Sequence, residues 1–388
     1  MIQPFIRDRF TWLAYFMLAY YAYLQATLGP SVPFIRDELG LNYTVSAFYI
    51  SAFALGMALA GLTGDRMARR FGRSFLFWGG GLGMALGAVL LMAGDNPAVT
   101  IGSTFIMALS GSYLLVMIQS TLSDRHGPNR AFALTEVNIA AVLAASLAPL
   151  AVGFGAAQGW TWRPALVAGI AIWVVVTVLT RRNTALPEAR PVETRGDTRG
   201  GRLPKAFWAY WLVVFFSVSV EWCMIFWAST YMESVVGLSK EVAATSVSLF
   251  TLAQFVGRAM GSWLTRRYAT GMLLLIAGGI VLVGFPLFWL GREPLVNALG
   301  LFLCGLGIAN LYPLTLAATS TVGQANPDAA SGLTSMGSGV AILITPQVLG
   351  AAADQIGIQG AYGIVAPLAV AIIFVTIYAN RLAKQTVT

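Results

Sequence analysis

The feature that most constrains this chain is the recurrence of apolar runs of about twenty residues from one end to the other. A bilayer core is about 30 Å thick, so a helix that spans it needs roughly 20 mostly apolar residues. Twelve runs have this length: 10–30, 45–64, 74–94, 99–122, 131–153, 164–181, 206–231, 242–264, 271–291, 295–320, 331–351 and 362–380. Backbone amides that face lipid must bond within their own segment, so each run is predicted to be an α-helix.

Composition agrees with a protein that lies in the membrane along its whole length. Hydrophobic residues make up 57% of the 388 and charged residues only 10%, whereas a soluble domain carries about 25% charge. The first run follows Arg7, Asp8 and Arg9 and is too long for a secretory signal, and it shows no small-residue cleavage site. We therefore predict an all-α, multi-pass protein of the cell membrane, in contact with lipid throughout.

The basic residues predict the orientation of the helices. If the N-terminus is inside, twenty of the 24 Lys and Arg residues fall on that side, and only Arg36, Arg163, Lys240 and Arg292 fall on the other. This asymmetry sets membrane topology and predicts that both termini and the 182–205 segment are cytoplasmic. The net charge of +8 is explained in this way, so no nucleic-acid partner is implied.

The polar segment 182–205 divides the chain into two parts of six predicted helices each, 1–181 and 206–388. Weak self-similarity joins them, because Gly61 and Arg66 recur as Gly261 and Arg266. Two further sets recur at offsets of 199 and 197: Pro128, Ala131, Leu134 and Thr135 as Pro327, Ala330, Leu333 and Thr334, and Pro149 and Gly153 as Pro346 and Gly350. Such repeats predict two pseudo-symmetric six-helix bundles, with the substrate site between them near the midplane.

The segment 61–73 reads GLTGDRMARRFGR and resembles the loop 2–3 signature of the major facilitator superfamily. That resemblance implies a gating motif made by Gly61, Asp65, Arg66, Arg70 and Arg73. Gly61 would let a neighbouring helix approach, and Asp65 would meet the positive end of a helix from the other half. The spacing departs from the signature, so which arginine gates stays open. The simpler alternative is a cluster that only enforces orientation.

A looser resemblance, to the fucose-permease branch, rests on scattered motifs. They are Arg130-Ala-Phe-Ala-Leu134 with Asn138 and Pro149, Glu221 with Trp227 and Tyr231, Gly257-Arg258, and Gly305 with Asn310 and Pro313. The resemblance implies a proton-coupled symporter of sugars or similar small solutes. Two departures are the absence of an acid in the first helix and of an arginine in the fourth. The region of Pro149 and Gly153 partly resembles an antiporter motif, so uptake and export both stay open.

Two carboxyl groups, Glu221 and Glu136, fall inside predicted spanning helices. Ionised carboxylates are costly in a bilayer, and intramembrane ionisable residues are therefore functional candidates. No Lys or Arg is expected at their depth, so either group is a candidate carrier of the coupling proton. The structural alternative is a protonated acid that only bonds another helix.

Other polar and aromatic residues are predicted to line a shared substrate cavity. They are Gln25, Tyr113, Gln119, Asn138, Trp222, Trp227, Tyr231, Gln254, Asn310, Tyr312 and Gln347. Aromatic rings with amides and a carboxyl group suit a sugar or an organic cation, and the lack of deep Lys or Arg disfavours a strongly anionic substrate. The alternative for each residue is a contact between helices or at the interface.

These observations predict a monomeric secondary transporter that moves a small neutral or cationic solute, sugar-like by preference, with protons or another coupling ion. The alternatives are a proton-antiport exporter and a membrane sensor. An enzyme is disfavoured, because the single histidine, His126, is expected in a solvated loop without a nucleophile or a metal-ligand cluster nearby. No cofactor or metal is expected. Neither the substrate nor the choice between proton and sodium follows from the sequence.

Overall fold

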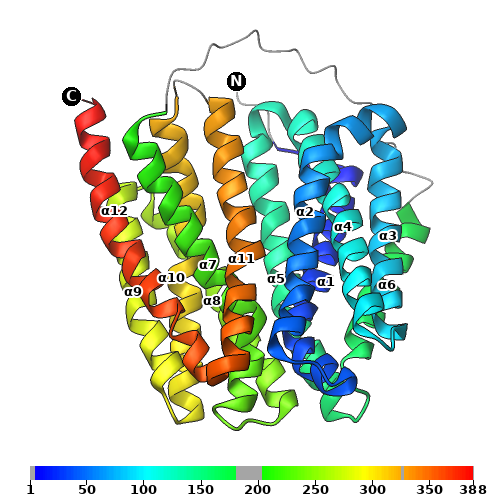
Figure 1. Cartoon of the computed structure of the whole chain (residues 1–388). Helices are drawn as coiled ribbons and strands as arrows, with labels where there is room; N and C mark the ends of the chain where they lie inside the picture. The colour runs from blue at the N-terminus through cyan, green and yellow to red at the C-terminus, as the bar shows by residue number, and fades with distance from the viewer. Residues whose placement is uncertain (1–4, 181–202, 325–326, 388) are drawn as a thin grey trace. The chain divides into compact units, whose positions relative to one another are not determined.

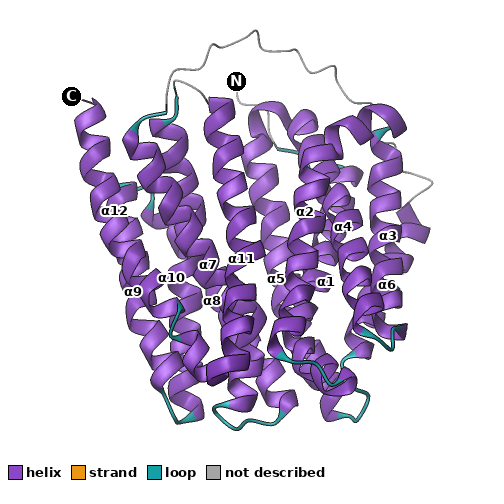
Figure 2. Ribbon diagram, viewed as in Figure 1, coloured by secondary structure: helices purple, strands orange, loops and turns teal. Residues whose placement is uncertain are grey.

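A computed structural model describes residues 5–180, 203–324 and 327–387, and these residues form helices and short connections without a strand (Figure 2). The twelve α-helices (Figure 1) are α1 Arg9–Leu39, α2 Tyr43–Phe71, α3 Arg73–Ala93, α4 Pro97–His126, α5 Arg130–Ala157, α6 Arg163–Thr180, α7 Lys205–Ser234, α8 Lys240–Leu264, α9 Thr270–Leu290, α10 Pro294–Val322, α11 Pro327–Tyr362 and α12 Val365–Val387. A 3-10 turn, Gly127–Asn129, precedes α5. The predicted all-α, twelve-helix fold is confirmed.

Eleven of these helices are long and apolar enough, over their described residues, to cross a membrane. The helix outside that group is α1, which carries four tyrosines in its first half. It runs nine residues beyond its predicted end, through Pro30 and Pro33, to a left-handed Gly40 with φ 61°. Asp8 begins the helix as its N-cap and accepts a hydrogen bond from the Thr11 backbone N–H.

Two other helices also differ from their predicted limits. α2 continues to Phe71 through the charged segment that was expected to be a loop, and Gly72, with φ 84°, separates it from α3. α11 is interrupted at Gly357, whose φ of 74° and ψ of 158° are not helical. A left-handed φ is open to glycine without steric cost, which is why these breaks fall at Gly72 and Gly357.

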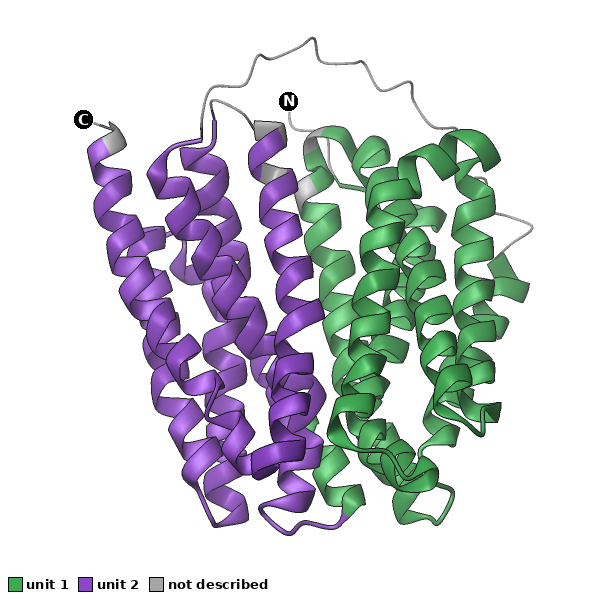
Figure 3. Cartoon of the chain, viewed as in Figure 1, with its two compact units in different colours: residues 1–191, 240–248 green, residues 192–239, 249–388 purple. Residues whose placement is uncertain are grey.

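The chain divides into two compact units (Figure 3): residues 1–191 with 240–248, and residues 192–239 with 249–388. The first two turns of α8 therefore belong to the first unit. The predicted domain limits, 1–181 and 206–388, stay a prediction, and most of the predicted 182–205 linker lies outside the described residues.

Each unit contains the same kind of close helix contact. A Cβ added to Gly56 of α2 would lie 2.8 Å from Ala108 of α4, and one added to Gly257 of α8 would lie 2.6 Å from Ala309 of α10. Both distances are shorter than a van der Waals contact, so only glycine fits. Corresponding helices therefore pack alike in the two units, as expected for a repeated bundle.

The core of the second unit is formed largely by α7. Cys223 and Trp227 of this helix are fully buried, as is Cys304 of α10. The Tyr362 hydroxyl donates to the Cys223 carbonyl over 3.0 Å and ties the end of α11 to the middle of α7. Glu221, six residues before Trp227, is thereby placed on a helix whose position is fixed by packing.

Candidate functional site

Glu221 lies near the middle of α7 and is half-buried. The buried Gln254 of α8 donates a hydrogen bond from Nε2 to its Oε1 over 2.6 Å. Arg258, one turn further along α8, is close enough to act electrostatically on the carboxyl group. The expectation that no cation reaches the depth of Glu221 is therefore wrong, although the direct partner is an amide. Glu221 and Gln254 thus form a carboxyl–amide pair between α7 and α8, with the Arg258 charge one turn away along α8.

Two of the aromatic candidates on α7 take part in helix packing. The Trp227 Nε1–H donates to the Pro346 carbonyl over 3.0 Å, and the Tyr231 hydroxyl donates to the Trp289 carbonyl. Both side chains are completely buried. These contacts favour the alternative that Trp227 and Tyr231 hold helices together and do not bind substrate. Trp222, next to Glu221, is half-buried, so part of its side chain is accessible.

Glu136 of α5 lies in a different environment, within the first unit. It accepts hydrogen bonds from Nε of Arg7 over 2.9 Å, from a terminal nitrogen of Arg7, and from the Tyr15 hydroxyl of α1. The expectation that Glu136 lacks a cation is wrong, because the segment before α1 brings Arg7 to it. Its carboxylate is engaged by an ion pair that ties α1 to α5.

A second polar cluster adjoins this ion pair at the start of α1. The Asp8 carboxylate pairs with Arg125 of α4 and accepts from the Thr11 hydroxyl over 2.7 Å. Burial raises the pKa of Asp8, but the Thr11 hydrogen bonds and the Arg125 charge outweigh it and leave that pKa below its ordinary value. His126, at the end of α4, lies 2.8 Å from the Thr11 hydroxyl and against the Phe5 ring. It is half-buried, so the expectation of a solvated loop residue is wrong.

Three further residues predicted to line the cavity form hydrogen bonds within their own helix or with a neighbouring helix. Tyr113 of α4 shares one with Thr63 of α2 over 2.7 Å. Asn138 donates to the Leu134 carbonyl of its own helix over 2.7 Å. Asn310 of α10 donates to the Gly257 carbonyl of α8 over 2.6 Å. Asn310 thus reinforces the close α8–α10 contact.

The other candidates differ in exposure. Gln25 of α1, Tyr312 of α10 and Gln347 of α11 are half-buried, and Gln119 of α4 is exposed. Gln25 and Gln119 belong to the first unit, and Tyr312 and Gln347 to the second. Two of the predicted site residues, Glu221 and Gln254, are joined by a direct hydrogen bond within the second unit. Substrate binding by the others stays a prediction.

The proposed gating residues lie on the last turns of α2 and the first residue of α3. Asp65 forms an ion pair with Arg69, four residues later on the same exposed helix face. Arg73 pairs with Asp124 of α4 over 2.7 Å. Arg66 and Arg70 are exposed, and a Cβ at Gly61 would meet no atom within 4 Å. The glycine of this segment that faces a neighbouring helix is Gly64, opposite Val116 of α4.

Sequence reasoning missed Arg7, Tyr15 and Arg125 as partners of the half-buried acids Glu136 and Asp8. A local signal existed for part of this, because Asp8 three residues before Thr11 is typical of a helix N-cap. That pattern would have placed Arg7 at the N-terminal end of α1. The pairing with Glu136 spans 129 residues, which no local pattern encodes.

Within residues 5–180, 203–324 and 327–387, no group of three or more His, Cys, Asp and Glu side chains is arranged to hold a metal ion.

Comparison with known proteins assigns the family. Residues 11–327 match the family model described as Major Facilitator Superfamily. The chain belongs to the Major Facilitator Superfamily. It is 23% identical over 392 residues to a protein of Cupriavidus necator named "Probable sulfoacetate transporter SauU", a match that covers 91% of this chain and 89% of that one. It is also 23% identical over 364 residues to an uncharacterized MFS-type transporter of Yersinia pestis, covering 88% of each.

Solved transporters of the superfamily share the fold. The nucleoside transporter NupG has a TM-score of 0.72 at 15% identity, over 95% of this chain and 98% of its own. A bacterial homologue of the lysosomal transporter Spinster, inward-facing and unoccupied, has a TM-score of 0.75 at 14% identity and covers 98% of both chains. At such identities the likeness concerns the fold alone. The chain is a superfamily transporter, and the branch resembling fucose permease stays a hypothesis.

Proposed function

We propose that this transporter moves a small neutral or cationic organic solute, sugar-like by preference, by proton-coupled alternating access, and that Glu221 carries the proton. The observation that supports this is the environment of Glu221, a half-buried mid-membrane carboxyl group whose direct hydrogen-bond partner is the Gln254 amide. An amide can bond either the ionised or the protonated acid after a small rearrangement. A carboxyl group held in this way can exchange a proton during a transport cycle.

The alternative with the same fold is export by proton antiport. It is favoured by Gly153 of α5, where a Cβ would lie 1.9 Å from the Thr245 hydroxyl and 2.6 Å from the Glu241 carbonyl of α8. Only glycine allows this approach, at the position that resembles the antiporter motif. The direction of coupling separates the two functions, because a symporter accumulates solute on the alkaline side of a membrane and an antiporter on the acidic side.

The test is uptake into reconstituted vesicles with an imposed pH gradient, over a panel of sugars, nucleosides, organic cations and sulfoacetate. We expect accumulation of a neutral or cationic solute on the alkaline side. Glu221→Gln should abolish accumulation while exchange between equilibrated pools continues. Glu293→Gln, a change to an exposed carboxyl group before α10, is the matched control. Gradient-driven accumulation by Glu221→Gln would refute the proton role, and transport of sulfoacetate alone would refute the substrate class.

We also propose that both termini and the 182–205 linker are cytoplasmic, supported by the twenty-to-four distribution of Lys and Arg. A cysteine introduced as Thr198→Cys should react with impermeant thiol reagents only from the cytoplasmic side. Labelling from outside intact cells would reverse the orientation.

A further inference from the structure

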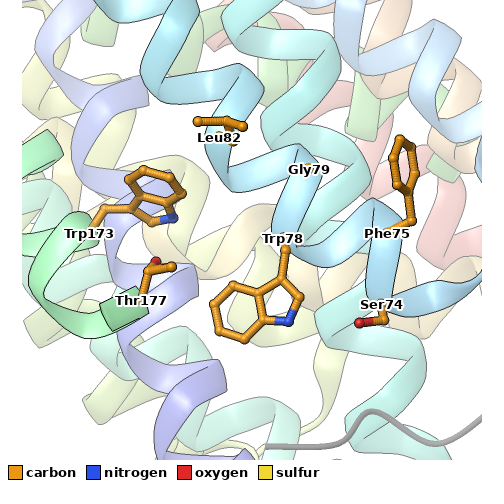
Figure 4. Close-up of a pocket in the computed structure, with 7 residues that line it drawn as sticks. All are labelled: Ser74, Phe75, Trp78, Gly79, Leu82, Trp173 and Thr177. Carbon is orange, nitrogen blue, oxygen red and sulfur yellow. The ribbon is translucent and has the colours of Figure 1, made fainter. Parts of the chain in front are cut away.

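A cavity of about 450 Å³ lies between α3 and α6, inside the first unit and apart from the carboxyl clusters. Figure 4 shows the indole rings of Trp78 and Trp173 on opposite sides of this space, with Ser74 and Thr177 at the same end. Ser74 and Trp78 are four residues apart on α3, as are Trp173 and Thr177 on α6, so each helix turns one hydroxyl and one indole N–H to one face. Among the described residues that line the cavity, four are hydrogen-bond donors and none is acidic.

Two of these donors have no partner among the described parts of the chain. The Trp173 indole nitrogen and the Thr177 hydroxyl are sealed from solvent and form no hydrogen bond there, and Trp173 is only 8% exposed. A threonine in a helix usually bonds the carbonyl four residues earlier, as Thr180 does with Val176 over 2.6 Å. A hydrogen-bond donor that stays unpaired inside a membrane lowers the stability of the protein by an amount on the order of several kcal/mol. Both residues line the cavity, and a change of side-chain rotamer would turn either donor toward an acceptor there.

The cavity opens on a surface that suits lipid. Beside it, α6 exposes large apolar side chains: Ile172 at 58%, Val175 at 57%, Val178 at 72% and Leu179 at 70%. On α3, Phe75 and Leu82 at the cavity wall are 62% and 49% exposed. Ser74 is the second residue of α3 and Thr177 lies three residues before the end of α6. The donors thus lie within about 10 Å of the helix ends, at 1.5 Å per residue, which is the depth of lipid headgroups and esters.

Charge at this end of the helices indicates the headgroup. The end of α2 carries Arg66, Arg69 and Arg70, and α3 begins with Arg73. Two acids oppose this charge, because Asp65 pairs with Arg69 and Asp124 with Arg73. The excess of positive charge attracts anionic lipid. A second copy of this chain would fit less well, because the backbone carbonyls of a helix are already bonded, whereas the ester carbonyls and phosphate of a lipid are free acceptors.

We propose that the α3–α6 cavity binds an anionic glycerophospholipid, whose ester and phosphate oxygens accept hydrogen bonds from Ser74, Trp78, Trp173 and Thr177. The acyl chain lies along Phe75 and Leu82. Bound lipid fills the gap between the two helices and stabilises the first unit.

The experiment measures thermal unfolding of the purified chain in detergent as dioctanoyl phosphatidylglycerol is added. A ligand that binds the folded state raises the melting temperature in a saturable way. Gly79→Leu places a side chain in the cavity, because Gly79 lines it and a Cβ there meets no atom within 4 Å. Its matched control is Gly279→Leu, since Gly279 lies in α9, two hundred residues later, and is equally open. Thr177→Val, combined with Ser74→Ala, removes both hydroxyl donors and keeps the cavity.

We expect saturable stabilisation of the wild type and of Gly279→Leu, loss of the shift in Gly79→Leu, and an apparent affinity about tenfold lower in the Thr177→Val, Ser74→Ala double variant. If Gly79→Leu does not fold, the double variant alone decides. Equal shifts in all variants would overturn the site, and equal shifts with dioctanoyl phosphatidylcholine would overturn the anionic headgroup. A shift with glycerol phosphate alone would mean a free phosphate site. Dimers in light scattering that Gly79→Leu abolishes would mean that a second copy occupies the cavity.

Discussion

Glu136 and Glu221 are the same residue type on two membrane helices, and their direct hydrogen-bond partners differ. Glu136 is held by the Arg7 guanidinium and the Tyr15 hydroxyl, whereas the direct partner of Glu221 is the Gln254 amide. A carboxylate that bonds a guanidinium directly, as Glu136 does, keeps its charge more firmly than one such as Glu221, on which the Arg258 charge acts without a direct bond. This difference fits the proposed division of roles, in which Glu136 joins α1 to α5 and Glu221 carries the proton.

The most direct way to break this comparison is to neutralise each acid in turn. Glu221→Gln should lower gradient-driven accumulation by about tenfold or more, because a glutamine cannot carry a proton. Glu136→Gln should leave the pH dependence of transport nearly intact. The measurement is solute accumulation in vesicles at a series of external pH values. If Glu136→Gln gave the larger loss of pH dependence, the two assignments would have to be exchanged.

A smaller effect is expected from Asp65, a third carboxylate that is paired like Glu136 but lies at the exposed end of α2. Asp65→Asn should slow transport by about fivefold if the residue also supports a conformational step, with substrate affinity unchanged. Stability should barely move, since an exposed pair such as Asp65–Arg69 contributes about 0.5 kcal/mol or less. Initial rates at saturating and low solute measure this. Unaltered turnover would leave only the orienting role of the segment.

The smallest effect concerns the Arg7–Glu136 pair itself. Arg7→Met and Glu136→Gln should each destabilise the first unit, and the double variant should lose less than the sum of the two losses, because neither partner is then left with an unpaired charge. Unfolding of the four proteins in detergent gives the coupling. If the losses of stability in the two single variants simply added up in the double variant, the ion pair would contribute nothing to stability. The proposed structural role of Glu136 would then be wrong.

The fold was largely predictable because a lipid-spanning apolar segment has one viable structure. All twelve apolar runs form helices, since the amides of each run must bond within it. The ends were less predictable. α2 continues through Asp65 and Arg69, which form an ion pair one turn apart, and α1 passes Pro30 and Pro33 before it ends at Gly40.

The sequence draws attention to individual polar residues of the candidate site but does not predict which of them are in contact. Glu221 and Gln254 stand out as polar residues in apolar runs, but their contact depends on how α7 and α8 are rotated against each other. Arg7 was overlooked because it lies before the first helix, where a basic residue is interpreted as a signal for the orientation of the helices in the membrane. Tertiary packing decides which acid lies next to a cation, and the hydropathy of the sequence does not predict these pairings.

The complete burial of Cys223 and Cys304 has a practical consequence for studying this transporter. The folded chain offers no accessible thiol among its two cysteines, both at 0% exposure. A cysteine introduced at a surface position would therefore carry the whole labelling signal, without removal of the native pair. Conversely, a dye that fluoresces on reaction with thiols would stay dark until the second unit opens, so the two native residues can serve as a built-in reporter of unfolding.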